Sequence, residues 1–493
     1  MTGHLAFVAA FLVLVLRDGF GAPALAGRLG PWGAAGATLG AMALFGVLVW
    51  MRMVWLCRAI DRRGSVRALR KASRLAGAAP TLGAAVFCVG VLVFGWLDAV
   101  RWWVGDGVGY DEAIALAPML ALSLCLSASV WGLERRSREA TLWRALGEGQ
   151  PVYAIPSRWG YTWSAARHGA LFVLIPAMTI FAWSEAVAWW FDVRDDALLA
   201  GEGDAAFWWA AAVQGGGAVL VVCATPWLAR VLWDTTPLRD GPLHDRLART
   251  AARRRVRIRE YLVWHTGGAH ANGAVVGVVP WLRYVLLTDA LLDALPEDEL
   301  EAVVAHEIGH VASRHIPWML ASVLGLAMTV SAVGVWVGDV VALGAWVSAA
   351  AWIAGGVGAI ALFGVISRRF ERQADVFAAG ALGGGDERGQ ERIAADGVQA
   401  MGGALARVTA LSGMNADRFT WRHGSIRSRQ RSLDAQIGAP IGRTRADRDA
   451  RRAKGMIALA LAVGLGLTVW TEASGFPGEA EEAGRGASIG TLD

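Results

Sequence analysis

Two histidines and a glutamate lie together in an otherwise apolar run, "AVVAHEIGHVASRH", at residues 302–315. His306 and His310 are four residues apart, so a helix would place both imidazoles on one face, close enough to bind one metal ion. Glu307 directly follows the first histidine. This is the H-E-x-x-H arrangement, in which two histidines bind zinc and the glutamate activates a metal-bound water. The spacing therefore predicts a hydrolytic metal centre.

The alternative is a polar helix face at a membrane surface. The flanking residues Ala302 to Ala305 and Ile308 are apolar, and unpaired polar side chains would be costly among them. A catalytic zinc needs a third protein ligand. Metzincins place a histidine six residues after the second one, but that position here is Ile316, which excludes that class. His315 would point roughly 140° away from His310 on a continuous helix, either on the surface or touching a ligand.

A candidate third ligand is Glu371, in the segment "SRRFERQAD" at residues 367–375. Glu371 and Asp375 are again four residues apart on a predicted helix. Glu371 would bind the metal, while Asp375 would accept a hydrogen bond from the far ring nitrogen of a ligating histidine and so fix its tautomer. The adjacent arginines leave a second interpretation open, a solvated charged face, and spacing alone does not choose between them.

The elements that position these residues are predicted to be membrane helices. Of the 493 residues 55% are hydrophobic and only 18% are charged, below the roughly 25% of soluble domains. Nine apolar stretches approach or reach the roughly 17–25 residues of a membrane span, although the first and last are short. They are residues 4–16, 32–55, 80–102, 113–133, 169–190, 206–233, 318–337, 342–366 and 456–471.

Charge along the chain predicts its orientation. Basic loops, such as "RTAARRRVRIRE" at 249–260, alternate with acidic ones such as 191–206. Because Lys and Arg favour the cytoplasmic side, the amino terminus and the site are expected on the cytoplasmic side of the inner or cell membrane, with the acidic tail outside. The net charge of +5 thus reflects topology, and no nucleic-acid partner is expected. The first apolar stretch lacks a preceding basic segment and is favoured as an uncleaved span over a signal peptide.

We predict a mainly α-helical, polytopic membrane protein with a small α+β, zincin-like domain. A helix is expected from about 296 to 314, and two segments that alternate or run in β-branched residues, 257–266 and 274–289, predict a small sheet. The hairpin of spans seven and eight would bring His310 and Glu371 together. The expected regions are an N-terminal membrane domain (1–234), a catalytic region (235–317), a transmembrane hairpin (318–366), a second catalytic part (367–453), and a last span with a disordered acidic tail (454–493).

The motifs "NGAVVG", "ALPEDELEAVVAHEIGHVASRH" and "SRRFERQADVFAAG", in this order, resemble the HtpX and CAAX-prenyl-protease family of membrane zinc metallopeptidases, of the gluzincin type. The resemblance covers roughly residues 240–435. It implies that His306, His310 and Glu371 bind one Zn²⁺ per chain. It further implies that Glu307 is the general base and that Asp375 contacts a ligand without binding the metal itself.

Two weaker correspondences follow from the same resemblance. The segment "WRHGSIRSRQRSL" at 421–433 resembles a later histidine segment of the family, with Gly424 where proline is usual. It implies that His423 donates to the oxyanion of the reaction, the alternative being an ordinary loop histidine. Asn272, Gly273 and Ala274 match the family's edge strand, which would pair with an extended substrate, or they form only a turn.

The predicted function is zinc-dependent endopeptidase activity on membrane or unfolded polypeptides, with quality control of membrane proteins as the role that the resemblance suggests. Processing of prenylated peptides is a less favoured alternative. A second alternative is a sensor that cleaves a regulator, although the outer loops are short for a ligand-binding domain. A third is a non-catalytic scaffold with structural zinc, which would not require Glu307.

Overall fold

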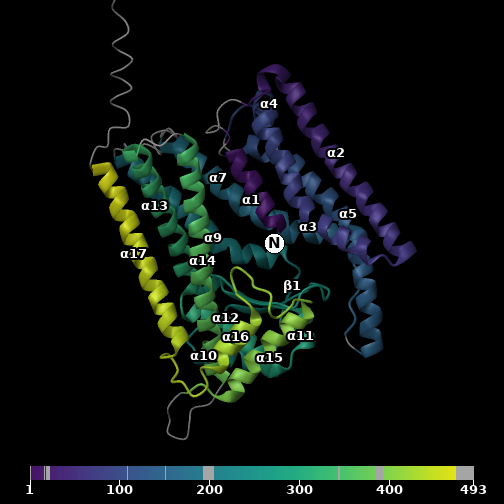
Figure 1. Cartoon of the computed structure of the whole chain (residues 1–493), viewed down its shortest axis with the longest axis vertical. Coiled ribbons are helices and arrows are strands. Elements are labelled where there is room, and N and C mark those ends of the chain that lie inside the picture. The colour runs from purple at the N-terminus through teal and green to yellow at the C-terminus, as the bar shows by residue number, and fades with distance from the viewer. Residues whose placement is uncertain are drawn as a thin grey trace, which may run out of the picture. The chain divides into compact units, whose positions relative to one another are not determined.

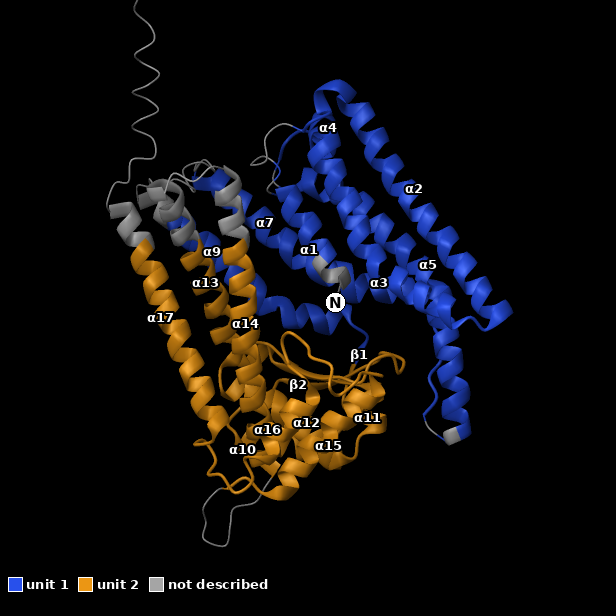
Figure 2. Ribbon diagram, in the orientation of Figure 1, with its two compact units in different colours: residues 1–235 blue, residues 236–493 orange. Residues whose placement is uncertain are grey.

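The computed structural model describes residues 2–15, 17, 23–107, 109–149, 151–191, 205–341, 345–382 and 392–473. The chain divides into two compact units, residues 1–235 and 236–493, which are coloured separately in Figure 2. Long helices make up most of the described residues, which also include one four-stranded sheet (Figure 1). The predicted fold class, a polytopic helical membrane protein with a small α+β part, is confirmed.

The first unit consists of apolar helices. They are α1 (Thr2–Val15), α2 (Ala26–Arg63), α3 (Val66–Val89), η2 (Gly90–Phe94), α4 (Trp96–Val104), α5 (Tyr110–Glu148), α6 (Arg158–Ala165), η3 (Ala166–Leu171), α7 (Phe172–Phe191) and α9 (Ala205–Leu232). Within the described residues, five helical segments are long and apolar enough to cross a membrane: Ala26–Arg63, Val66–Phe94, Tyr110–Gly147, Arg158–Phe191 and Trp209–Leu232. The total of nine spans stays a prediction.

The predicted third span, residues 80–102, differs from the observed helix. The helix begins at Val66, where the Ser65 hydroxyl accepts a hydrogen bond from the Ala68 amide at 3.2 Å and caps it. It is interrupted at Gly95, whose φ of 79° lies in the left-handed region that glycine tolerates. The span is therefore shifted toward the amino terminus, and residues 96–102 belong to the separate helix α4.

The sheet of the second unit supports the site. Its strands are β1 (Thr235–Pro237), β2 (Glu260–Trp264), β3 (Gly273–Val276) and β4 (Tyr284–Thr288), in the order β1-β2-β4-β3. Strand β4 is buried along its whole length; it pairs in parallel with β2 and antiparallel with β3. Strand β3 has a neighbour on one side only and is therefore an edge strand of the small sheet.

Helices α10 (Pro242–Arg253), α11 (Asp289–Ala294) and α12 (Glu297–Ala312) pack against this sheet. Their shared apolar core explains why the helix with both histidines lies beside the strands, since burial of such side chains contributes roughly 1.5–3 kcal/mol each. The core includes Leu247, Val285, Leu291, Val304 and Ile308. The helix predicted over 296–314 is thus observed as α12, two residues shorter at its end.

Ion pairs fix the first turns of α12. Glu299 is buried and accepts hydrogen bonds from Arg407 of α15 (Ala395–Leu411), at 2.7 and 3.0 Å. Glu301 accepts from Arg246 of α10 at 2.5 Å. The acidic residues at the start of the helix therefore hold it between two neighbouring helices, in addition to favouring its dipole.

Helices α13 (His315–Val341), α14 (Ala345–Leu382) and α17 (Arg445–Ala473) lie side by side (Figure 1), with Phe370, Ala450 and Ile457 in their shared core. Helix α14 is continuous, so the segment that carries Glu371 is the end of the same helix that contains the predicted eighth span. The shorter helix α16 (Ile426–Asp434) follows α15. The predicted acidic tail lies outside the described residues.

Candidate metal centre

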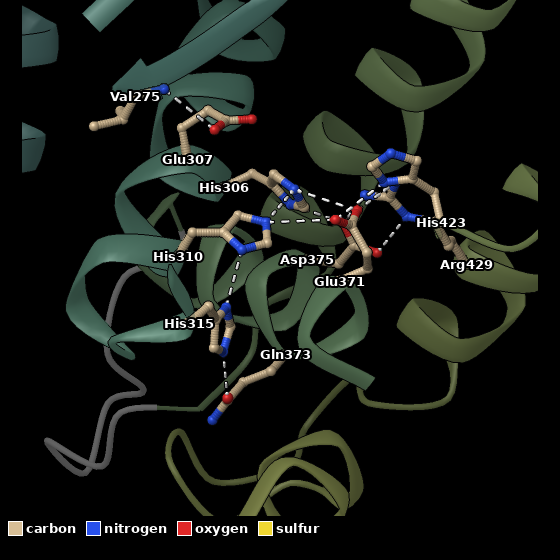
Figure 3. A network of polar contacts seen from close by, with 10 residues as sticks. All are labelled: Val275, His306, Glu307, His310, His315, Glu371, Gln373, Asp375, His423 and Arg429. Atoms are coloured by element: carbon tan, nitrogen blue, oxygen red, sulfur yellow. Dashed lines mark hydrogen bonds and ion pairs between the residues drawn. The ribbon is translucent and has the colours of Figure 1, made fainter. Parts of the chain in front are cut away.

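Three side chains from two helices meet in the second unit. His306 and His310 come from α12 and Glu371 comes from α14 (Figure 3). One ligand atom of each lies within 4.8 Å of the others. The two Nε2 atoms are 3.2 Å apart, and the Glu371 carboxylate oxygens lie 3.8 Å from His306 Nε2 and 3.7 Å from His310 Nε2. The i, i+4 spacing predicted from the sequence thus brings both imidazoles to one carboxylate.

This donor set fits a zinc ion. Two ligand atoms at about 2.0–2.1 Å from a tetrahedral zinc lie about 3.3 Å apart. The two Nε2 atoms have this separation, at 3.2 Å, and the Glu371 oxygens lie slightly farther away, at 3.7 and 3.8 Å. Two imidazole nitrogens and one carboxylate are ligands that zinc accepts in catalytic sites, with the fourth position left for water. We therefore treat His306, His310 and Glu371 as the candidate ligands.

A glycine lets the two helices approach closely enough for this contact. A Cβ atom at Gly309 would lie 3.0 Å from Cδ1 of Phe377 and 3.2 Å from its Cβ. Because Gly309 lies between the two histidines in sequence, and Phe377 lies nearly two turns after Glu371, this contact sets how near α12 comes to α14.

Asp375 lies behind His306, as its spacing predicted. Its Oδ1 is 3.0 Å from His306 Nδ1, so the nitrogen that faces away from the site has an acceptor (Figure 3). Burial disfavours protonation of His306, but the hydrogen bond and charge of Asp375, together with the charge of Glu371, outweigh it and raise the pKa of the imidazole. A carboxylate in this position makes the imidazole a stronger electron donor toward a metal.

Arg429 of α16 joins the two carboxylates of α14. Its Nη1 lies 3.1 Å from Glu371 Oε2, its Nε 2.9 Å from Asp375 Oδ2, and its Nη2 2.5 Å from Asp375 Oδ1. All three side chains are buried. Burial opposes ionisation of Asp375, but the charge and hydrogen bonds of Arg429, together with His306, outweigh it and lower the pKa of this carboxyl to about 2.

His423 also contacts Glu371. Its Nδ1 lies 3.0 Å from Glu371 Oε1, and its side chain is 48% exposed. Burial disfavours the charged form of Glu371, but the hydrogen bond with His423 and the charge of Arg429 hold its pKa well below the usual range. The carboxylate is therefore ionised, which is the form that binds metal. Donation by His423 to an oxyanion stays a prediction.

Two further pKa shifts suit a metal hydrolase. Burial, with the nearby His306, lowers the pKa of His310 to about 3, which favours the neutral imidazole that a metal requires. Burial also raises the pKa of Glu307, against the opposing effects of His306 and the Val275 amide. A carboxylate with a raised pKa is a better proton acceptor near neutral pH.

His315 points toward the site rather than away from it. Helix α12 ends at Ala312, and Arg314 has a left-handed φ of 55°, so the 140° projection along one helix fails. His315 starts α13, is completely buried, and places its Nδ1 3.0 Å from His310 Nδ1. Of the two predicted placements, surface exposure is wrong, and contact with a candidate ligand is what the structure has.

The predicted strand residues lie at the edge of the sheet. Asn272 O accepts from the Thr288 amide at 3.0 Å, so this backbone group is used within the sheet. Antiparallel pairing alternates, so the backbone groups of Gly273 and Val275 point outward instead. The Val275 amide donates to Glu307 Oε2 at 3.3 Å (Figure 3). The edge therefore adjoins the candidate base, with Val275 in place of Ala274 as the outward-facing neighbour of Gly273.

A cleft of about 420 Å³ contains these residues. Its lining includes Gly273 and Val275 of the edge strand and apolar residues of α15, among them Met401, Leu405 and Val408. His306, Glu307, His310, Glu371 and His423 all line it. Its volume lies within the usual range of ligand pockets.

Arg429 was not predicted from the sequence. One signal marks it: Ile426, Arg429 and Leu433 follow the i, i+3, i+7 spacing of a buried helix face, and an arginine on such a face needs acidic partners. Its partner Asp375 lies 54 residues away, and no local pattern connects the two.

Residues 237–415 match the sequence model of Peptidase family M48. A curated relative, the protease HtpX homolog of Trichormus variabilis, is 44% identical over 52 residues, which are 10% of this chain and 18% of the relative. The CAAX prenyl protease 1 homolog of Arabidopsis thaliana is 31% identical over 94 residues, 19% of this chain and 22% of that protein. The chain thus matches less than a quarter of each relative's length.

A solved structure, that of S. mikatae Ste24p, aligns with 80% of this chain and 99% of its own, with a TM-score of 0.40 and 15% identity. With so low a TM-score, this likeness supports no further conclusion about this chain. The matching segment 237–415 contains His306, Glu307, His310, Glu371 and Asp375, so the family resemblance inferred from these motifs is confirmed.

Proposed function

Because residues 237–415 match the model of Peptidase family M48, we propose that this chain is a membrane-bound zinc endopeptidase. One observation carries the proposal: His306, His310 and Glu371 hold their ligand atoms within 4.8 Å of one another, next to Glu307. Bound there, zinc would acidify water and polarise a carbonyl group.

The side chains of the site would divide the reaction among them. Glu307 takes a proton from the attacking water as the water oxygen bonds to the carbonyl carbon of the substrate. The same carboxyl then returns this proton to the leaving amine nitrogen, and the peptide bond breaks. His423, half exposed at the cleft, would donate a hydrogen bond to the oxyanion, a contribution of about 2.7–4 kcal/mol for such donors.

The substrate would be a polypeptide in extended form. The backbone groups of Gly273 and the carbonyl of Val275 point away from β4, where an added strand could pair with them, and the apolar residues of α15 that line the cleft would receive side chains. Recognition through main-chain groups tolerates many sequences, which suits membrane-associated or unfolded proteins. Quality control of membrane proteins, from the cytoplasmic side, is the proposed role.

The substitution Glu307→Gln tests the proposal in the purified full-length protein. We expect the variant to keep its zinc, measured by elemental analysis, and to lose cleavage of unfolded casein by several orders of magnitude, because glutamine cannot accept the proton. Glu297→Gln, at the exposed start of the same helix, is the matched control and should cleave at the normal rate. Full activity in Glu307→Gln would disprove the assigned base.

A further inference from the structure

His310 offers its Nε2 to the candidate metal, so its Nδ1 must carry the ring proton. The group that faces this nitrogen is another imidazole: His315 Nδ1 lies 3.0 Å away. Either ring can donate in such a pair, and only one of the two arrangements leaves His310 Nε2 free for a metal. The choice of the His315 nitrogen that carries the proton therefore decides whether His310 Nε2 is free to bind a metal.

The far side of His315 contacts Gln373 of α14. His315 Nε2 lies 2.9 Å from Gln373 Oε1, and Gln373 Nε2 donates to Asp447 Oδ1 at 2.9 Å (Figure 3 draws the first contact). The His315 ring is completely buried and stacks on Phe370 at 4.3 Å between centroids, which holds its orientation. Which group donates and which accepts in each of these hydrogen bonds depends on Asp447.

Asp447 can only accept at this position. Its Oδ2 accepts from the Thr444 amide at 3.0 Å and the Thr444 hydroxyl at 2.7 Å, and Thr444 Oγ1 accepts from the Asp447 amide at 3.1 Å. This is a capping box at the start of α17. An ionised carboxylate has no proton to donate, so Gln373 turns its NH₂ group toward Asp447 and its oxygen toward His315.

The proton positions then follow one after another. Gln373 Oε1 needs a donor, so His315 Nε2 carries a proton and His315 Nδ1 does not. His315 Nδ1 needs a donor in turn, so His310 Nδ1 carries a proton and His310 Nε2 keeps its lone pair. We propose that this hydrogen-bonded relay, Asp447 to Gln373 to His315 to His310, locks His310 in its metal-binding tautomer from helix α17.

The proposal deepens the metal centre of the proposed function and rests on it. Asp447 lies beyond residue 415, where the family match ends, so the relay extends the site into a part of the chain that the match does not include. Lys454, two turns further along α17, donates to the Ser313 carbonyl at 2.7 Å. Helix α17 therefore holds both the relay and the junction between α12 and α13.

The sharpest test exchanges donors and acceptors along the relay while changing the shape of only one side chain slightly. In Asp447→Asn, the amide oxygen still accepts from Thr444, so the new NH₂ group points at Gln373 and forces it to turn over. His315 then donates from Nδ1, and His310 must carry its proton on Nε2, where it blocks the metal. We expect the dissociation constant for Zn²⁺, measured by competition with a fluorescent chelator on full-length protein in detergent, to rise about 10- to 100-fold.

Adding Gln373→Glu to Asp447→Asn restores the original direction, because the introduced carboxylate accepts both from the introduced amide and from His315. The double variant should return to within about threefold of normal zinc affinity, a rescue that a merely structural role would not give. Gln436→Leu is the control: Gln436 is also buried and accepts from the Arg445 amide of α17 at 3.2 Å, outside the relay.

The outcomes separate the two proposals. Normal zinc affinity in Asp447→Asn, or no rescue in the double variant, would overturn the relay and leave the metal centre standing. Equal weakening by Gln436→Leu would also overturn it. If the unmodified protein binds no zinc with His306 and His310 intact, the metal centre falls and the relay falls with it.

Discussion

At the scale of single residues, Arg429 balances the charge of the site. It is the cation between two buried carboxylates, Glu371 and Asp375, and each of these supports the candidate metal in a different way. A buried ion pair of this kind adds little net stability when complete, but losing one partner leaves an uncompensated charge in the interior.

We expect Arg429→Leu to destabilise the metal-free protein by about 3–5 kcal/mol, because both carboxylates then remain buried without a counter-charge. The measurement is thermal unfolding in detergent with EDTA present. Arg427→Leu, on the same helix, removes an ion pair with Asp417 whose side chains are 53% and 58% exposed, and should cost no more than about 1 kcal/mol. Equal losses in the two variants would contradict this account of Arg429.

Local spacing predicted the pair of histidines, whereas the roles of Glu371 and Asp375 also needed the family resemblance. His306 and His310, like Glu371 and Asp375, are four residues apart, and the helical period alone places each pair on one face. The spacing could not join the two pairs, because that depends on how α12 packs on α14. Arg429 and the link from His315 to Gln373 depend on the same packing, and so they emerged only from the structure.

At the scale of elements, the close contact of α12 with α14 sets the dimensions of the site. We expect Gly309→Val to push Phe377 and α14 away, to destabilise the protein by about 1–3 kcal/mol, and to weaken zinc binding. Thermal unfolding and chelator competition measure the two effects.

The control is Gly402→Ala on α15. A Cβ atom at Gly402 would meet nothing within 4 Å, so alanine should be neutral or stabilise the helix by up to about 1 kcal/mol. If Gly309→Val binds zinc normally, the distance between these helices does not control the site.

Helix boundaries were the least predictable feature at this scale. The break after Ala312 redirects His315, yet Ser313 and Arg314 include neither glycine nor proline, the residues that usually announce such a break. The sheet was easier to predict, because β-branched runs mark β2, β3 and β4. The three-residue strand β1, Thr-Thr-Pro, is too short to show a pattern and was missed.

At the scale of the whole molecule, the distribution of charge predicts the side of the membrane on which the site works. Helix α17 begins with a basic segment that contains Arg445, Arg448, Arg451, Arg452 and Lys454. A reporter fused after Lys454 should therefore lie in the cytoplasm. A reporter fused after Gly201, in the acidic sequence 191–206, should lie outside. An external signal from the first fusion would refute the assigned orientation.

The order of synthesis gives the relay one more consequence. A ribosome makes Asp447 and Lys454 after every candidate zinc ligand, so a nascent chain stalled before Thr444 already has the two imidazoles and the carboxylate but not the group that orients the proton of His310. Such an unfinished chain would hold zinc weakly. On the relay proposed above, zinc affinity would rise by about 10- to 100-fold once helix α17 is complete.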